Sequence, residues 1–222
     1  MIEKRTSPNC AKCNTKSCDS KDARTADLPV FCPMKTATKT IQNVVNSVNT
    51  DADLKKFYLA SAWVEKNAYE TVRGKITPVW PRAREVIEFA KRLDVKKLGV
   101  AFCIGLSDEA KRVVEIFEEH GFEVYSVVCK CGGVDKTRFG VLPSEKIDNS
   151  NDFEAACNPL LQAELLHQAG TGLNVTVGLC VGHDSLFFMH SKTPTTALIV
   201  KDRVTGHNPL VSLYSQYHKN TL

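Results

Sequence analysis

The chain has 222 residues, 43% of them apolar, which is enough to bury the core of one domain or of one and a half. Its net charge of +4 is small and its basic residues are scattered, so we expect no nucleic-acid partner. No apolar stretch approaches the roughly 20 residues that a membrane span needs, and the charged residues 1–5 are not followed by the apolar run of a secretory signal. These features predict a cytoplasmic protein with no membrane partner.

Nine cysteines are the most informative feature of the composition. Cytosolic thiols are kept reduced, so a disulfide framework is a poor explanation for them in a cytoplasmic protein. The odd count also rules out complete pairing within the chain. Metal binding or catalysis explains these cysteines better.

The polar N-terminal segment, residues 1–36, has the cysteine spacing C-x2-C-x4-C-x13-C. It is too short to bury a core of its own, so something else must order it. Four thiolates can bind one zinc ion or one iron–sulfur cluster. Pro33 follows the last cysteine, as proline does in bacterial ferredoxins, which favours a 4Fe-4S cluster and keeps zinc as the alternative. A disordered tail with unrelated cysteines is the remaining interpretation. The four candidate metal ligands are Cys10, Cys13, Cys18 and Cys32.

The next segment, 37–94, is predicted to be helical and to pack on the core of the protein. Apolar residues recur at intervals of three and four, with Asp51 or Asp53 at the start of one repeat and Gly74 at its end. A further helix begins at Pro81, because proline is well tolerated in a first helical turn. The predicted helices are 38–48, 54–72 and the one that follows Pro81.

From Lys97 onward, short apolar runs alternate with helical periodicity. This order predicts an α/β domain over 95–222, with a mostly parallel four-stranded sheet and helices on both faces. Helices are expected to begin near Ser107, Asn158 and Leu186. The expected strands are 98–103, 122–128, 174–179 and 195–200.

Five cysteines of this domain lie where predicted strands end or a helix starts. In open α/β sheets, ligands bind at the carboxyl ends of the strands, and a helix N-terminus favours the thiolate of a nearby cysteine. A set of thiolates suits zinc or an iron–sulfur cluster. The expected ligands of this core site are Cys103, Cys129, Cys157 and Cys180, with Cys131 as an additional candidate.

Two histidines are expected beside the core site. His183 follows Cys180 in the stretch Cys-Val-Gly-His-Asp, and His207 precedes Asn208-Pro209. Imidazole titrates near neutral pH and suits proton transfer, so both histidines are candidate catalytic residues. The alternatives stay open: Cys180 is then an inert buried thiol, His183 a surface residue and His207 part of a turn.

Six stretches carry a resemblance to a known family. They are 10–13, 31–33, 129–130, 157–159, 178–184 and 201–209. Through them the sequence resembles an uncharacterised family, a domain of unknown function labelled as metal-binding and frequent in anaerobic bacteria and archaea. The resemblance covers nearly the whole chain. It implies a metal but no reaction, and in that family the position of Cys131 is often not cysteine.

We therefore expect an iron–sulfur protein with two sites. The N-terminal cluster would relay electrons or brace the fold. The core cluster would serve redox or sulfur chemistry, with a small-molecule substrate or an electron-transfer partner. A non-enzymatic zinc-binding or metal-carrier protein is the alternative. The sequence predicts neither the substrate nor the oligomeric state.

Overall fold

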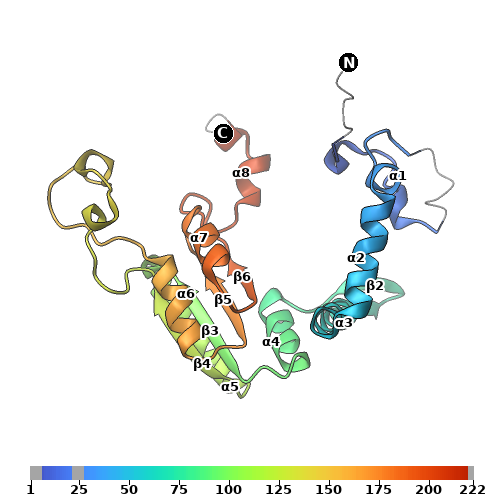
Figure 1. The fold of residues 1–222 in the computed structure, drawn as a ribbon, viewed down its shortest axis with the longest axis horizontal. Helices are drawn as coiled ribbons and strands as arrows, with labels where there is room; N and C mark the ends of the chain where they lie inside the picture. The colour runs from blue at the N-terminus through green and yellow to red at the C-terminus, as the bar shows by residue number, and fades with distance from the viewer. Residues whose placement is uncertain (1–6, 22–27, 220–222) are drawn as a thin grey trace. The chain divides into compact units, whose positions relative to one another are not determined.

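The computed structural model describes residues 7–21 and 28–219 (Figure 1). It forms two compact units, Met1–Ala62 and Trp63–Leu222. Residues 1–5, which the expectation about a secretory signal concerns, lie outside the described ranges. Residues 22–27 of the segment 1–36 lie outside them as well. Among the helices of the described residues, none has the length and apolar character that a membrane crossing requires. The functional division of the chain after residues 36 and 94 stays a prediction.

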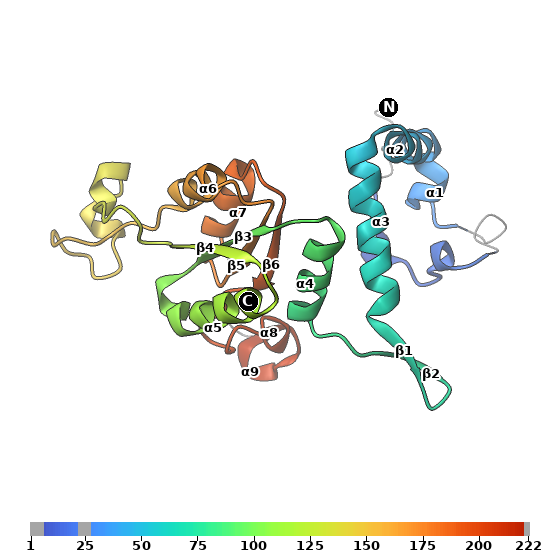
Figure 2. The ribbon, with the colours of Figure 1, turned by 90° about the horizontal axis from the view of Figure 1, so that it is seen from below.

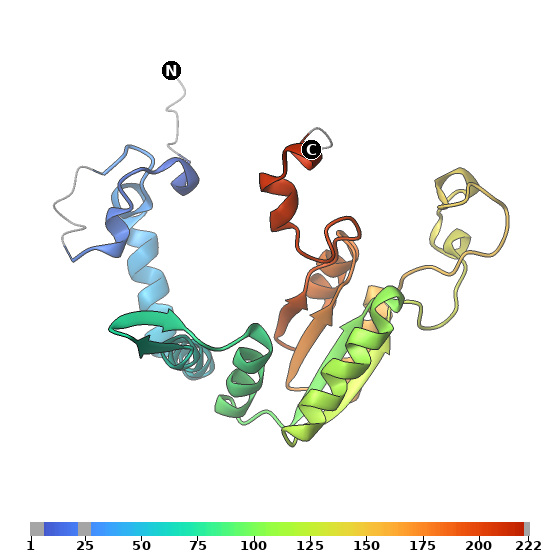
Figure 3. The same cartoon turned by 180° about the vertical axis from the view of Figure 1, so that it is seen from behind.

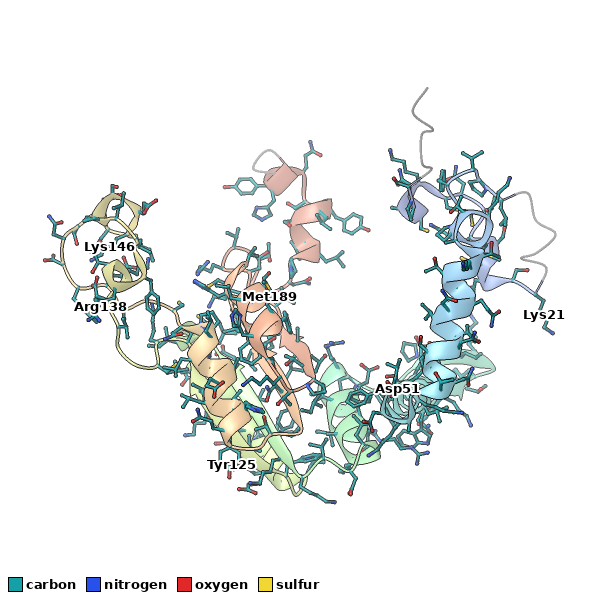
Figure 4. The ribbon with its side chains drawn as sticks, viewed as in Figure 1. Lys21, Asp51, Tyr125, Arg138, Lys146 and Met189 are labelled. Atoms are coloured by element: carbon teal, nitrogen blue, oxygen red, sulfur yellow. The ribbon has the colours of Figure 1, made fainter. Side chains whose placement is uncertain are left out.

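The first unit consists of short turns followed by helices. The 3₁₀ turns η1 (Cys10–Lys12) and η2 (Ser17–Asp19) precede α1 (Pro33–Thr36), α2 (Thr38–Thr50) and α3 (Ala52–Asn67). Asp51 separates the last two helices, and its Oδ1 accepts a hydrogen bond from Leu54 N at 2.9 Å. That bond satisfies one of the free N–H groups at the start of α3, so the predicted cap at Asp51 is confirmed (Figure 4).

The helix predicted over 54–72 is wrong in its second part. Helix α3 ends at Asn67, and β1 (Tyr69–Val72) then pairs antiparallel with β2 (Lys75–Pro78). Both residues of the connecting turn have positive φ, 51° at Arg73 and 77° at Gly74. A two-residue turn of this kind matches the twist of a hairpin. Gly74 therefore closes a hairpin and does not end a helix.

The second unit contains the predicted parallel sheet. Its strands are β3 (Lys97–Phe102), β4 (Glu123–Val128), β5 (Leu173–Val177) and β6 (Thr195–Ile199), in the order β4-β3-β5-β6 and all parallel. Figure 2 shows helices on both faces of this sheet, and Figure 3 shows α5 covering one of them. The predicted fold class is thereby confirmed. The helices are α4 (Arg82–Arg92) and α5 (Ser107–Glu119) on one face, and α6 (Pro159–Gln168) and α7 (His183–His190) on the other.

Every residue of β5 is buried, as its uncharged, β-branched sequence predicts for a central parallel strand. One of them, Asn174, is polar, and neighbouring side chains satisfy it. Its Oδ1 accepts from Thr171 Oγ1 at 2.8 Å, and its Nδ2 donates to Ser191 Oγ at 3.2 Å. These bonds hold the Asn174 amide in one orientation within the core.

Several boundaries differ from the prediction for local reasons. Ser107 does not cap α5, because its hydroxyl donates to Ile104 O at 2.7 Å inside a short 3₁₀ turn, η3 (Ile104–Leu106). Strand β5 stops at Val177, because Gly178 has a φ of 64° that leaves the extended conformation. Helix α7 begins at His183, three residues before the predicted start. The C-terminal segment adds α8 (Leu210–Tyr214) and α9 (Gln216–Lys219).

Gly99 on β3 gives a test of this packing. A Cβ at Gly99 would lie 2.1 Å from Asn174 Oδ1, which the hydrogen bonds above hold in place. We expect Gly99→Ala to lower the free energy of unfolding by about 1–3 kcal/mol in urea denaturation. Gly172→Ala is the control, because the three atoms nearest to its Cβ would all belong to the Val95 side chain, the closest at 3.2 Å, and that side chain can shift. Equal losses in the two variants would contradict the proposed clash.

Candidate metal centres

All four N-terminal cysteines of the first unit line one cavity of about 160 Å³. Apolar side chains close much of its wall. The lining includes Cys10, Cys13, Cys18 and Cys32, with Leu28, Pro29, Phe31, Pro33 and Met34. The structure thus brings the four predicted N-terminal ligands around a shared space, although 21 residues separate the first of them from the last, 10 to 32.

Short hydrogen-bonded turns place these thiols. Cys13 N donates to Cys10 O at 3.0 Å, and Lys16 Nζ donates to the same carbonyl at 2.9 Å, which ties the first turn to the second. Cys32 precedes α1, and its carbonyl accepts from Lys35 N at 2.9 Å. The pKa of the Cys13 thiol is lowered, chiefly by the hydrogen bond with the Thr15 hydroxyl. A lowered pKa favours the thiolate, which is the form that binds metals.

In the second unit, the register of the sheet places Cys103 and Cys129 at the same edge. Phe102 pairs with Val128 on one side and with Val177 on the other. The ladder continues beyond the strands, since Cys129 N donates to Phe102 O at 2.8 Å and Cys103 N to Val177 O at 3.1 Å. Both cysteines are buried. This is the carboxyl edge at which parallel sheets bind ligands.

A long excursion between β4 and α6 leaves this edge and returns to it. Its two ends are joined by backbone bonds from Asn158 N to Cys129 O and from Ala156 N to Val134 O, both 2.7 Å. Inside it, Asp135 accepts from Glu154 N at 2.8 Å and pairs with the buried Lys146 amine at 3.4 Å (Figure 4). Because the two ends of this segment are joined, Cys157 lies next to Cys129.

Cys129, Cys157 and His183 form the centre of the core site. Hydrogen bonding with the Cys129 thiol, and then with the His183 imidazole, lowers the pKa of Cys157 to about 4. The pKa of Cys129 is raised, first by that bond to Cys157 and then by burial, so the pair loses its first proton from Cys157. Cys129 Sγ also accepts a hydrogen bond from Ile104 N at 3.3 Å. Cys157 is therefore the more acidic thiol of the pair, and it lies next to the Cys129 thiol and the His183 imidazole.

Two cations from the segment after β6 contact the other predicted thiols. Lys201 Nζ lies 3.5 Å from Cys103 Sγ, and Arg203 Nη2 donates to Cys180 Sγ at 2.9 Å. A coulombic interaction with Cys103 is a smaller cause of the raised pKa of Cys129. Cys180 is therefore held by a guanidinium, while Cys103 and Cys157 both lie within electrostatic reach of Cys129.

The remaining candidates have local partners. Cys131 Sγ is directed to Asn158 O at 3.9 Å, and burial raises its pKa. His207 Nδ1 accepts from Asp202 N at 3.1 Å, which is the turn-stabilising alternative. Asp184 Oδ1 accepts from Gly182 N at 3.1 Å and so stabilises the start of α7. In the described part of the chain, no three His, Cys, Asp or Glu side chains are grouped closely enough to hold a single metal ion.

Sequence reasoning missed the groups that donate to the core sulfurs. Lys201 and Cys103 are 98 positions apart, and Arg203 is 23 positions from Cys180. One signal was available, because Lys201 and Arg203 directly follow a predicted strand. The rule that selected the cysteines at strand ends also selects these two cations.

Comparison with known proteins identifies the family. Residues 32–198 match the family described as "Protein of unknown function (DUF1847)". The chain belongs to this DUF1847 family. It is also 42% identical over 214 residues to the uncharacterized protein MJ0455 of Methanocaldococcus jannaschii, covering 96% of this chain and 97% of that protein. No solved structure matches the chain. The range matched to the DUF1847 family includes Cys32 and every core cysteine.

The unequal pKa values of the core thiols can be measured in metal-free protein. The thiolate is the form that alkylates, so Cys157, with a pKa of about 4, should react with iodoacetamide at a nearly constant rate from pH 8 down to pH 5. Cys131, whose pKa is raised, should react slowly and lose about tenfold in rate for each pH unit below its pKa. Timed alkylation followed by peptide mass spectrometry measures the reaction rates of both cysteines. A tenfold fall per unit at Cys157 between pH 8 and 5 would contradict the structure.

Proposed function

We propose that this protein is an iron–sulfur protein with two cysteine-bound centres, one in each compact unit. The observation that carries the proposal is the cavity of about 160 Å³ lined by all four N-terminal cysteines. Four cysteine thiolates can bind one zinc ion or one iron–sulfur cluster. Pro33 directly after the last cysteine favours the 4Fe-4S cluster over the zinc ion.

The wall of the N-terminal cavity also suits a cluster. Phe31 and Met34 contribute apolar surface, and Pro33 follows the last cysteine. Solvent exclusion and hydrogen bonds near the sulfurs set the potential of an iron–sulfur cluster. We assign electron relay to this centre, with an electron-transfer protein as its partner. Iron–sulfur chemistry and reduced thiols make a cytoplasmic location part of the proposal.

The core centre is proposed to bind a second cluster through Cys103, Cys129, Cys157 and Cys180. Three of these sulfurs face hydrogen-bond donors, namely Lys201 at Cys103, Ile104 N at Cys129 and Arg203 at Cys180. Donors and positive charges at the sulfurs stabilise thiolates and the negative charge of a cluster that they bind. A cluster here would supply electrons for redox or sulfur chemistry on a small molecule.

His183 is the proposed proton carrier of the core centre. Its imidazole lies close enough to Cys157 to lower the pKa of that thiol, and so lies at the carboxyl edge of the sheet. Imidazole exchanges a proton near neutral pH, which suits a group that protonates or deprotonates a bound molecule. His207 has a weaker claim, because its Nδ1 is engaged by the backbone of Asp202.

The direct test is to measure iron, sulfide and zinc in anaerobically purified protein, together with its visible and electron paramagnetic resonance spectra. Two 4Fe-4S clusters correspond to about eight iron and eight sulfide per chain. Zinc without sulfide would support the alternative, a zinc-binding or metal-carrier protein, and would overturn the cluster assignment.

The two centres should be separable. Replacing Cys10 and Cys13 by serine removes two ligands of the cavity in the first unit and none in the α/β unit. We expect the double variant to lose half of the iron and sulfide while the spectrum of the core cluster persists. Loss of all iron from a variant that keeps its circular dichroism spectrum would mean that the cysteines form one shared site.

The fourth core ligand can be identified by three substitutions. Cys180→Ala should strip or convert the core cluster, whereas Cys131→Ser, the matched control, should keep its spectrum because Cys131 faces a backbone carbonyl. His183→Ala should keep the cluster if His183 only carries protons. If His183→Ala lost iron and Cys180→Ala kept it, His183 would be the fourth cluster ligand and Cys180 would not. The readout is iron content and the electron paramagnetic resonance spectrum of each variant.

A further inference from the structure

Helix α2 presents an apolar stripe that no described residue of its own unit buries. Ile41, Val44, Val45 and Val48 recur at the spacing of one helix face, yet α2 contains no buried residue. Val44 is 58% exposed and Val45 is 48% exposed. A helix with a one-sided apolar stripe normally lays that stripe against another surface.

Helix α3 widens the stripe into a groove. Leu54, Tyr58 and Leu59 are also exposed, and a groove of about 320 Å³ runs between the two helices. Its lining is Val44, Val45, Val48, Asn49, Lys55, Tyr58 and Leu59. Two neighbouring helices thus share one uncovered apolar face, which we call the α2–α3 face.

The size of the α2–α3 face is that of a protein interface. Its six large exposed side chains present on the order of 600 Å² of surface, more than the few hundred Å² usual for an apolar patch on a monomer. A stable protein–protein interface buries about 800 Å² on each partner. The six apolar side chains supply most of the surface that one partner contributes to such an interface. The six are Ile41, Val44, Val45, Leu54, Tyr58 and Leu59.

The chemistry of α2 selects among the classes of partner. Its sequence, TKTIQNVVNSVNT, has a single charged residue, Lys39. A helix that lies on a membrane surface carries many Lys and Arg residues on its polar face, and a nucleic-acid surface is basic as well. Neither description fits α2. Its neutral Asn, Gln, Ser and Thr side chains allow two copies of the helix to meet without like-charge repulsion.

We infer that a second copy of this chain covers the α2–α3 face, through a two-fold interface in which α2 and α3 of both copies form a four-helix bundle. In such an interface the same patch meets itself. The stripe of α2 carries no charge and is therefore self-complementary, and Lys55 is the one charged residue in the lining of the groove. Val and Ile side chains of one copy fill the groove of the other. The inference concerns assembly and holds whether or not the cysteines bind a cluster.

The test is the molar mass of reduced, anaerobic protein by light scattering after size exclusion, at micromolar concentration. The wild type should have twice the mass of one chain. Val45→Glu and Val45→Lys should each give single-chain mass, because a like charge would face its own copy across the two-fold axis. An equimolar mixture of the two variants should return to twice the mass, since Glu then faces Lys.

Met189→Glu is the matched control, because Met189 is 77% exposed on α7 and lies outside the α2–α3 face (Figure 4). It should keep twice the single-chain mass. Circular dichroism of each variant confirms that its helices persist. A wild-type protein of single-chain mass would overturn the inference and would mean that another surface covers the stripe. Failure of the mixture to reassociate, with a wild-type dimer, would overturn it as well.

Discussion

The buried amide of Gln162 holds together the sheet edge on which the core thiols stand. From the first turns of α6, its Nε2 donates to Phe102 O at 3.2 Å and to Val127 O at 2.6 Å. These carbonyls belong to β3 and β4, close to the point where Cys103 and Cys129 follow. Two strands and a helix are thereby fixed to one fully buried side chain. Because breaking such bonds would leave buried polar groups unsatisfied, the relative position of the two thiols is strongly determined.

The same helix carries the second constraint. Asn158 caps α6, since its Oδ1 accepts from Leu161 N at 3.0 Å, and its own N–H donates to Cys129 O. The residue before this cap is Cys157. The backbone hydrogen bond from Asn158 N to Cys129 O therefore joins the start of α6 to the end of β4. This bond also places Cys157 next to Cys129. The electrostatics follow, because two neighbouring thiols cannot both ionise easily, and the hydrogen bonds with Cys129 and then with His183 lower the pKa of Cys157.

The sequence predicts the parts of this arrangement that depend on local patterns. The uncharged run of β5 predicts a strand buried on both faces, and Asn158-Pro159 predicts the start of α6. The hairpin β1–β2 was not predicted, because the apolar repeat of α3 continues into β1 and Gly74 suits a helix end as well as a turn. Nor did periodicity indicate that Lys201 would reach Cys103, since that contact depends on the path of the chain after β6.

The N-terminal and core cysteines also differ in when they become available during synthesis. The four that line the N-terminal cavity all belong to the first 36 residues, so a ribosome exposes the full set before any strand of the sheet exists. The core thiols extend from Cys103 to Cys180, and the last of them follows β5, the strand that pairs with β3. Chains released early would carry a complete N-terminal set and an incomplete core set. Completion of the core set of thiols thus requires synthesis of the chain through β5, and completion of the N-terminal set does not.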